Sequence, residues 1–353
     1  MSSQMTPRKV AMGLLFVSAL ALLVGLFNAG RLAQESAQSR AENGDSTSVA
    51  AMLNKKPHLA LVELTGMITM DDSKESGLFR SESNAVVARK ALDEAAKDDS
   101  VKGVLLRINS PGGTVGMSQE LNAAVKRVSV THKKPVVVSM GDLTASGGYY
   151  TACAADRIIA NPGTLTASIG VIISTMDFSD LMKEKLGVQA VTIKSGKFKD
   201  ILSPYRKPTP EDRALVQELV NSSYQDFLNT VIEGRTRFIT DPKAKADLTA
   251  RITAVADGRV VGGKEAVVAG LVDELGDFEH AYDVLDQMAK ERFNLRGKAR
   301  LDLVSDSGRS SLLDWLGFSP VGSSHVSVAP VDVAAQMLPL SLRYPNQPLW
   351  VME

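Results

Sequence analysis

The chain has 353 residues, of which 44% are hydrophobic and 23% charged, as in an ordinary globular protein with one large or two small domains. Its 40 basic residues equal its 40 acidic ones, so no basic excess indicates nucleic acid as a partner. A single cysteine, Cys153, excludes an intrachain disulfide, and the four histidines stand in no metal-ligand spacing, so we expect neither a metal nor a cofactor.

An uncharged apolar run follows two cations near the start of the chain. Arg8 and Lys9 precede Val10–Phe27, which is at the short end of the ~17–25 residues that span a hydrocarbon core. The positive-inside rule keeps residues 1–9 in the cytoplasm and sends the rest of the chain across the bilayer. We predict an uncleaved transmembrane anchor over 10–30. The alternative is a cleaved signal peptide, whose apolar region is usually shorter and ends in an A-x-A-like site that "FNAG" matches poorly.

Residues 31–56 are polar and rich in Ser, Ala, Gln and Glu, which indicates a linker. Beyond it, strands and helices alternate over a predicted main domain at 57–295, and this is typical of an α/β fold with crossover connections. The remaining residues, 296–353, form a predicted C-terminal extension that becomes rich in Ser, Gly and Pro from about residue 305.

The apolar periodicity predicts the individual elements of the main domain. We expect strands over 58–68, 101–109 and 134–140, a strand, turn and strand over 157–173, and a strand, helix and turn over 257–277. We expect helices over 84–98, 117–130, from 147 onward, 209–234 and 277–291, and a loop over 141–146.

The stretch "TASGGYY" places Ser146 after a strand and a loop, where a helix is expected to begin. By base rate, a serine there caps the helix. Gly147 and Gly148 carry no side chains, however, so backbone N–H groups at the helix start can approach a substrate carbonyl. An oxyanion hole beside a nucleophile is built in this way, and Ser146 is therefore a candidate nucleophile as well as a candidate cap.

A second glycine-rich turn, "NSPGG" at 109–113, also follows a predicted strand. Ligands bind along the carboxyl edge of the sheet in α/β folds, and Gly112 and Gly113 can offer a second N–H to the same oxyanion. An ordinary strand-to-helix turn is the alternative. Two such turns, one of them carrying a candidate nucleophile, favour a catalytic site.

A serine nucleophile needs a base, and no histidine stands out. The loop "IKSGKFKDILSP" offers Lys194, Lys197 and Lys199, although most loop lysines are solvated surface charges. A lysine that acts as base must be neutral near pH 7, which requires its pKa to fall from ~10.4, for instance by burial beside apolar groups. The spacing alone does not choose among the three lysines.

Four segments together resemble the signal peptide peptidase A family of bacterial serine–lysine peptidases. They are "RINSPGGTV", "TASGGYYTACAADRIIANPGTLTASIGVI", "IKSGKFKDILSP" and "DGRVVGGKEAVVAGLVDELG", within a match from about residue 58 to 290. The resemblance implies a Clp protease/crotonase-like ββα superhelix behind a single N-terminal transmembrane helix, of the short single-domain type. It also implies residence in the bacterial cytoplasmic membrane, with the catalytic domain outside the cytoplasm.

The family's functional residues transfer onto matching positions of this sequence. The resemblance implies that Ser146 is the nucleophile and that Lys199, just before the aspartate of "KFKD", is the base. It implies that Ser168, in "TASIG", orients the lysine. The backbone N–H groups of Gly113 and Gly147 match the oxyanion hole.

The resemblance also implies partners and substrates. Short members of the family assemble as ring-like octamers in which serine and lysine can come from neighbouring subunits. Their substrates are hydrophobic peptides, such as cleaved signal peptides in the lipid bilayer. We expect Gly112, Leu143, Tyr149 and Ile169 to line the substrate site, with core packing as the alternative role for the last three. A crotonase-type acyl-CoA enzyme and a catalytically silent membrane scaffold are the alternative functions.

Overall fold

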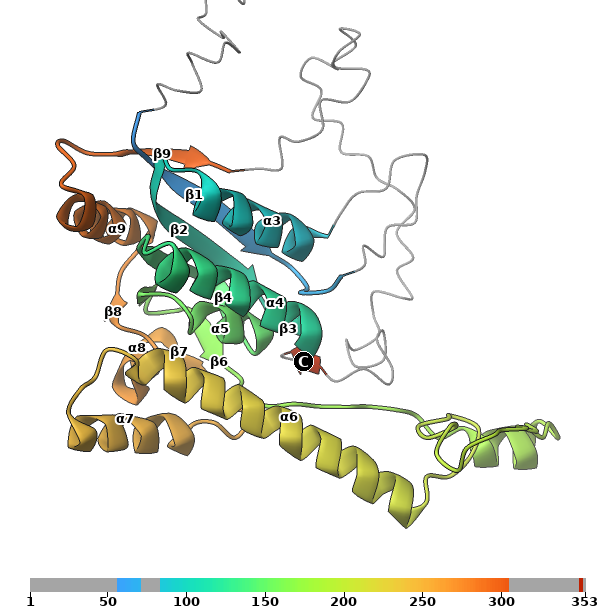
Figure 1. The fold of residues 1–353 in the computed structure, drawn as a ribbon. Helices are drawn as coiled ribbons and strands as arrows, with labels where there is room; N and C mark the ends of the chain where they lie inside the picture. The colour runs from blue at the N-terminus through green and yellow to red at the C-terminus, as the bar shows by residue number, and fades with distance from the viewer. Residues whose placement is uncertain (1–55, 71–82, 305–348, 352–353) are drawn as a thin grey trace, which may run out of the picture. The chain divides into compact units, whose positions relative to one another are not determined.

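The computed structural model describes residues 56–70, 83–304 and 349–351 (Figure 1). The anchor predicted at 10–30 lies outside these residues. Within them, no helix combines the length and the apolar character needed to cross a membrane.

A mixed β-sheet forms the centre of the described body (Figure 1). The strand order is β7-β6-β4-β2-β1-β9, with β5 beside β4 and β8 beside β5. All of these neighbours run parallel except β6 and β7. The strands are β1 (His58–Thr65), β2 (Val101–Ser110), β4 (Val136–Ala145), β5 (Arg157–Ala160), β6 (Leu165–Ala167), β7 (Val260–Gly262), β8 (Glu274–Leu275) and β9 (Arg300–Leu303). Together with the helices that connect them, these strands confirm the predicted α/β class.

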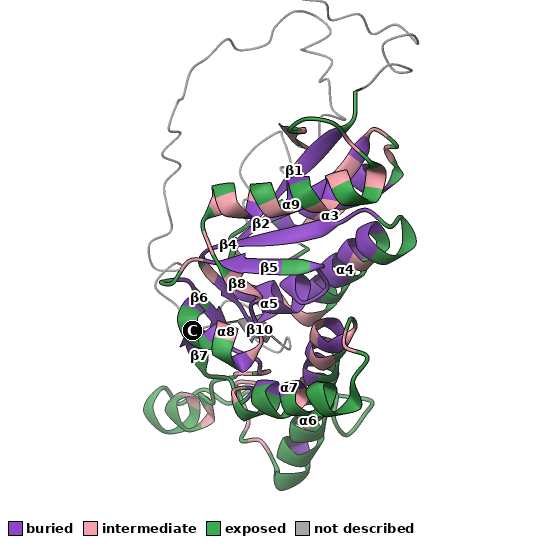
Figure 2. Ribbon diagram, turned by 90° about the vertical axis from the view of Figure 1, so that its left-hand side faces the viewer, coloured by how far each residue is buried: buried purple, intermediate pink, exposed green. Residues whose placement is uncertain are grey.

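Helices pack on both faces of this sheet, and Figure 2 shows β1, β2 and β4 buried between them. Successive strand residues point to opposite faces: Leu105 joins the hydrophobic cluster beneath α9, whereas Leu106 joins the larger cluster on the other face. The helices are α3 (Asn84–Lys97), α4 (Val115–Lys126), α5 (Gly147–Ala152), α6 (Pro210–Thr236), α7 (Pro242–Ala254), α8 (Gly263–Ala269) and α9 (Phe278–Phe293). The long apolar strands β1, β2 and β4 thus give the two-sided core that a parallel sheet requires.

Strand β4 is longer than its sequence pattern predicts. We expected a loop over 141–146, but the strand continues to Ala145, which pairs with Ala167 of β6. The Thr144 hydroxyl donates to the Ile108 carbonyl at 2.9 Å, and the Thr166 hydroxyl donates to the Thr144 carbonyl at 2.6 Å. These cross-strand bonds hold the polar end of β4 in the sheet, so the strand leads directly into Ser146.

The helix predicted at 117–130 also differs. Helix α4 begins at Val115 and ends at Lys126, and a π-helical turn, η1 (Arg127–Thr131), continues it. A further short strand, β3 (Gly112–Thr114), precedes α4 and pairs antiparallel with β10 (Leu349–Val351). Strands β9 and β10 both belong to the C-terminal extension, where the sequence pattern predicts no element.

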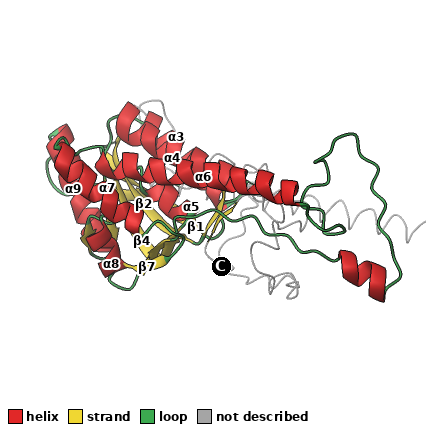
Figure 3. Cartoon of the chain, turned by 90° about the horizontal axis from the view of Figure 1, so that it is seen from below, coloured by secondary structure: helices red, strands yellow, loops and turns green. Residues whose placement is uncertain are grey.

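The chain between β6 and α6 leaves the body as a long arm (Figures 1 and 3). We use "the arm" for residues 171–209, which include the π-helical turn η2 (Leu181–Lys185). Its apolar side chains are widely exposed: Ile193 is 97% and Val191 82% accessible, and the others are Ile172, Met176, Phe178, Leu181, Leu186, Val188, Phe198 and Tyr205. Such a run of exposed apolar residues is typical of an interaction surface.

A buried lysine closes the end of α3. The Lys134 ammonium, in a residue that is 6% exposed, donates to the carbonyls of Ala95, Ala96 and Asp98 at 2.8–2.9 Å. Burial lowers the pKa of Lys134. We expect Lys134→Met to keep the apolar stem but to leave these carbonyls unpaired, which costs about 1–3 kcal/mol of unfolding free energy. Urea unfolding followed by circular dichroism measures this cost, with the exposed neighbour Lys133→Met as control. Equal stability of the two variants would contradict the capping role.

Candidate active site

Ser146 has the backbone and side-chain environment of a functional residue. It lies at the start of α5 with φ 51° and ψ −119°, a strained conformation for a residue other than glycine. The residue is fully buried, and its hydroxyl makes no hydrogen bond to any described residue, not even to the helix it precedes. The alternative of a capping hydroxyl is therefore wrong. A buried unpaired hydroxyl at a strained position is the arrangement expected of a nucleophile awaiting substrate.

Ser168, the predicted orienting residue, lies beside Ser146. The backbone N–H of Ser146 donates to the Ala167 carbonyl at 2.8 Å, because β4 and β6 end side by side. Ala167 and Ser168 also have positive φ, 66° and 50°, and the Ser168 N–H donates to the Arg259 carbonyl at 2.9 Å. Antiparallel pairing of β6 with β7 thus holds this turn in place, and the structure brings the two predicted serines together.

Gly113 presents its N–H toward the edge of β3 that pairs with β10. On the opposite edge of β3, Ile68 makes backbone hydrogen bonds to the two residues that flank Gly113. The Ile68 N–H donates to the Gly112 carbonyl at 2.9 Å, and the Thr114 N–H donates to the Ile68 carbonyl at 2.8 Å. Successive peptide groups of a strand point in opposite directions, so the Gly113 N–H faces away from Ile68, toward the side on which β10 lies.

The start of α5 packs close to this strand. Helix α5 contacts β3, and a Cβ at Gly148 would lie 3.1 Å from the Ser110 carbonyl oxygen. The first N–H groups of a helix, here those of Gly147 and Gly148, have no partner within the helix. Two elements that the sequence analysis assigned to an oxyanion hole, carrying Gly113 and Gly147, are therefore neighbours in the fold.

The predicted substrate-lining residues divide into two groups. Gly112 adopts φ 105°, which favours glycine, and its N–H donates to the Ser110 hydroxyl at 3.1 Å. Leu143 is partly exposed near the end of β4. Tyr149 and Ile169 are fully buried in the hydrophobic core, and the Tyr149 hydroxyl donates to the Leu271 carbonyl at 2.7 Å. In this structure the last two pack within the body and offer no accessible surface.

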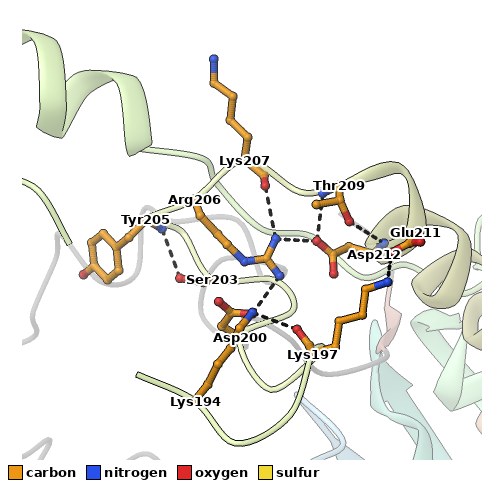
Figure 4. A network of polar contacts seen from close by, with 10 residues as sticks. All are labelled: Lys194, Lys197, Asp200, Ser203, Tyr205, Arg206, Lys207, Thr209, Glu211 and Asp212. Carbon is orange, nitrogen blue, oxygen red and sulfur yellow. Dashed lines mark hydrogen bonds and ion pairs between the residues drawn. The ribbon is translucent and has the colours of Figure 1, made fainter. Parts of the chain in front are cut away.

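The three candidate lysines lie on the arm and are not equivalent. Lys194 pairs with Asp200, and Lys197 pairs with Glu211 (Figure 4). Lys199 is exposed, and its ammonium has no hydrogen-bond or ion-pair partner within the described part of the chain. The arm that carries Lys199 extends away from the sheet (Figures 1 and 3), and within the described part of the chain no hydrogen bond joins the Lys199 ammonium to the Ser146 hydroxyl.

Sequence reasoning missed a charged cluster next to Lys199. Arg206 pairs with Asp200 at 2.9 Å and with Asp212 at 2.5 Å, and Asp212 caps α6 reciprocally with Thr209 (Figure 4). The motif "TPED" is a capping signal that could have located Asp212, but no local pattern indicates its pairing with Arg206.

The ion pairs of Asp200 lower the pKa of its carboxyl group. Hydrogen bonds from Arg206 and then from Lys194 lower the pKa of Asp200 to about 2. The stabilisation from this depressed pKa is present above the ordinary carboxyl range, ~3.9, and is lost as the pH falls toward 2.

Among the described residues, no group of three or more His, Cys, Asp or Glu side chains could hold a metal ion.

Comparison with known proteins identifies the family. The model of peptidase family S49 matches residues 129–292. A putative protease of Methanocaldococcus jannaschii is 41% identical over 65% of this chain and 70% of its own length. A putative signal peptide peptidase SppA of Enterococcus faecium is 38% identical over 75% of this chain and 71% of its own length. Protease 4 of Salmonella typhi is 32% identical over 80% of this chain and 42% of its own length.

Among solved structures, a membrane-bound stomatin-specific protease matches 71% of this chain and 99% of its own, with 12% identity and a TM-score of 0.39, below the level that defines a shared fold. The sequence relatives confirm the resemblance drawn from the four motif segments. The chain belongs to peptidase family S49, a family of serine peptidases.

Proposed function

We propose that the chain is a membrane-anchored endopeptidase that cuts hydrophobic peptides with a Ser146–Lys199 dyad. The observation that carries this proposal is the strained, buried Ser146, whose hydroxyl has no partner among the described residues. Serine with a lysine base is one of the known solutions for acyl transfer without histidine. We also propose that the sheet and its helices form a ββα superhelix of the Clp protease/crotonase type, which is the fold that the family resemblance implies.

The mechanism proceeds in two halves. Neutral Lys199 accepts the proton of the Ser146 hydroxyl while its oxygen forms a bond to the peptide carbonyl carbon. The N–H groups of Gly113 and Gly147 stabilise the oxyanion, and Ser168 orients the lysine. Lys199 then gives its proton to the departing amine as the peptide bond breaks. Water, deprotonated by the same lysine, releases the acyl group and restores Ser146.

The ion pairs on the arm support Lys199 as the base. A carboxylate partner stabilises the charged form of a lysine, which cannot accept a proton. Lys194 and Lys197 each have such a partner, whereas the Lys199 ammonium has none in the described ranges 56–70, 83–304 and 349–351. Lys199 is thus the lysine of the three that can reach a neighbouring site without breaking an ion pair.

The arm supports a site shared between copies of this chain. The arm, which carries Lys199, leaves the body that holds Ser146 (Figures 1 and 3). It also exposes Val191, Ile193 and other apolar side chains, which a partner surface would cover. In this proposal the arm packs against a neighbouring subunit of a ring, an octamer by the family resemblance, and delivers Lys199 to the neighbour's Ser146. Such head-to-tail contacts close into rings.

The edge of β3 that pairs with β10 supports an extended peptide as substrate. Residues 349–351 pair with it as an antiparallel strand, so this edge accepts an extended chain beside Gly113. Pairing by strand addition holds a peptide by its backbone and leaves side-chain pockets to set preference. Signal peptides left in the bilayer fit the apolar anchor predicted at 10–30 and the name of the Enterococcus relative, signal peptide peptidase. With that anchor, the catalytic domain lies outside the cytoplasm.

Hydrolysis of a hydrophobic fluorogenic peptide by the full chain in detergent micelles tests this function. We expect turnover, and labelling of Ser146 by a serine-directed acylating probe. Absence of both would favour a catalytically silent scaffold. Hydrolysis of an acyl-CoA thioester without peptide hydrolysis would favour the crotonase-type alternative.

A further inference from the structure

A charged cluster ties the loop that carries Lys199 to the tip of a long helix (Figure 4). Nη1 of Arg206 contacts Asp212 at 2.5 Å, and Nη2 contacts Asp200 at 2.9 Å. The same Asp200 oxygen accepts from the Lys194 ammonium at 2.5 Å, and Lys194 also donates to the Lys197 carbonyl at 2.8 Å. The residues on both sides of Lys199, at 197 and 200, are therefore held in place.

The groups of this cluster are shielded although the surrounding arm is exposed. The side chains of Asp212 and Asp200 are only 4% and 11% accessible, and Arg206 is 27% accessible. Hydrogen bonds between ionised groups are about twice as strong as neutral ones. Arginine is suited to this place because its planar guanidinium holds two separate nitrogens at a fixed spacing, one for each carboxylate, whereas a lysine offers a single nitrogen.

Helix α6 gives the cluster a rigid support. Its C-terminal half is anchored in the body: Phe227 and Val231 are fully buried, and the Tyr224 hydroxyl donates to the Ala256 carbonyl at 2.7 Å. A Cβ on Gly234 would lie 2.2 Å from the Cys153 carbonyl oxygen, so the helix approaches α5 closely there. Asp212 lies in the first turn at the other end of the helix, where Thr209 caps it. Arg206 thus connects the loop that carries Lys199 to helix α6, whose C-terminal half is packed in the sheet domain.

We propose that Arg206, with Asp200 and Asp212, is a positioning residue that fixes the geometry of Lys199 for proton transfer. This inference rests on the proposed Ser146–Lys199 dyad. The cluster also has an electrostatic consequence. Because Arg206 and Lys194 both bind the Asp200 carboxylate, its ion pairs are made with them and not with the adjacent Lys199.

The first test replaces Arg206 in the full chain. We expect Arg206→Met to lower kcat for the fluorogenic peptide by about 10–100-fold with little change in KM, since a displacement of ~1 Å can cost that much. Arg206→Lys, which keeps one of the two contacts, is expected to recover part of the loss. Glu211→Gln is the matched control: it breaks the exposed pair with Lys197 next to Asp212 and should leave kcat within about twofold.

A double-mutant cycle separates positioning of Lys199 from a general structural effect. The substrate is an activated p-nitrophenyl ester, whose leaving group needs no proton, so that the Lys199→Ala variant retains measurable turnover. If Arg206 acts through Lys199, Arg206→Met adds no further loss in the Lys199→Ala background. An equal loss in both backgrounds, wild-type kcat for Arg206→Met, or loss of assembly by light scattering would each overturn the positioning role. Full peptide hydrolysis by Lys199→Ala would instead refute the dyad itself.

Discussion

Ser146→Ala and Lys199→Ala should each lower kcat for peptide hydrolysis by at least ~10³-fold, because the members of such a catalytic unit act together. Neither change removes a contact that supports the fold. The Ser146 hydroxyl and the Lys199 ammonium both lack partners among the described residues. We therefore expect unchanged thermal unfolding and unchanged assembly, which circular dichroism and light scattering measure beside the kinetics. Wild-type kcat in either variant would contradict the dyad.

Mixing the two inactive variants tests where the site forms. If Ser146 of one chain meets Lys199 of its neighbour, mixed rings assembled from equal amounts of Ser146→Ala and Lys199→Ala chains contain intact sites at about a quarter of positions. Hydrolysis should then return to roughly that fraction of the wild-type rate. A mixture that co-assembles but stays inactive would place both residues in one chain, and the arm would have to fold back onto its own body.

The local pattern of the sequence predicts much of the fold and marks Ser146 as a candidate nucleophile. Apolar periodicity locates α3, α6 and α9 within a few residues, because each helix buries one face regardless of its partners. The glycines after Ser146 correctly indicate a helix start, and two glycine turns after parallel strands do lie together, because parallel strands end at a common edge.

The remaining features depend on contacts between distant parts of the chain. Strand β4 extends to Ala145, which pairs with Ala167 of β6, and the N–H of the strained Ser146 donates to the Ala167 carbonyl. The cluster of Arg206 depends on a loop folding onto the tip of α6, and no residue spacing encodes that approach. The family resemblance, and not the residue spacing, assigned Lys199 as the candidate base. The structure adds an independent observation: Lys194 and Lys197 each form an ion pair with a carboxylate.

Gly113→Ala should damage both the fold and the chemistry. A Cβ at this position would lie 2.0 Å from the carbonyl oxygen and 2.8 Å from the Cα of Ile68, and these backbone atoms cannot rotate away. Either β3 or the Ile68 segment must shift, which weakens the two backbone bonds that bracket Gly113. Forced overpacking of this kind costs about 1–3 kcal/mol of unfolding free energy.

The same shift would move the N–H that we assign to the oxyanion hole, and losing one such donor costs about 10²–10³-fold in kcat. Gly116→Ala is the matched control, since its Cβ would meet open space in the first turn of α4, and alanine there is neutral or stabilising by up to ~1 kcal/mol. Urea unfolding and the acylation rate of Ser146 by the serine-directed probe, measured on folded protein, separate the two effects. A destabilised Gly113→Ala variant that acylates at the wild-type rate would mean that glycine is required there for packing alone, and the oxyanion donor would have to be sought in α5.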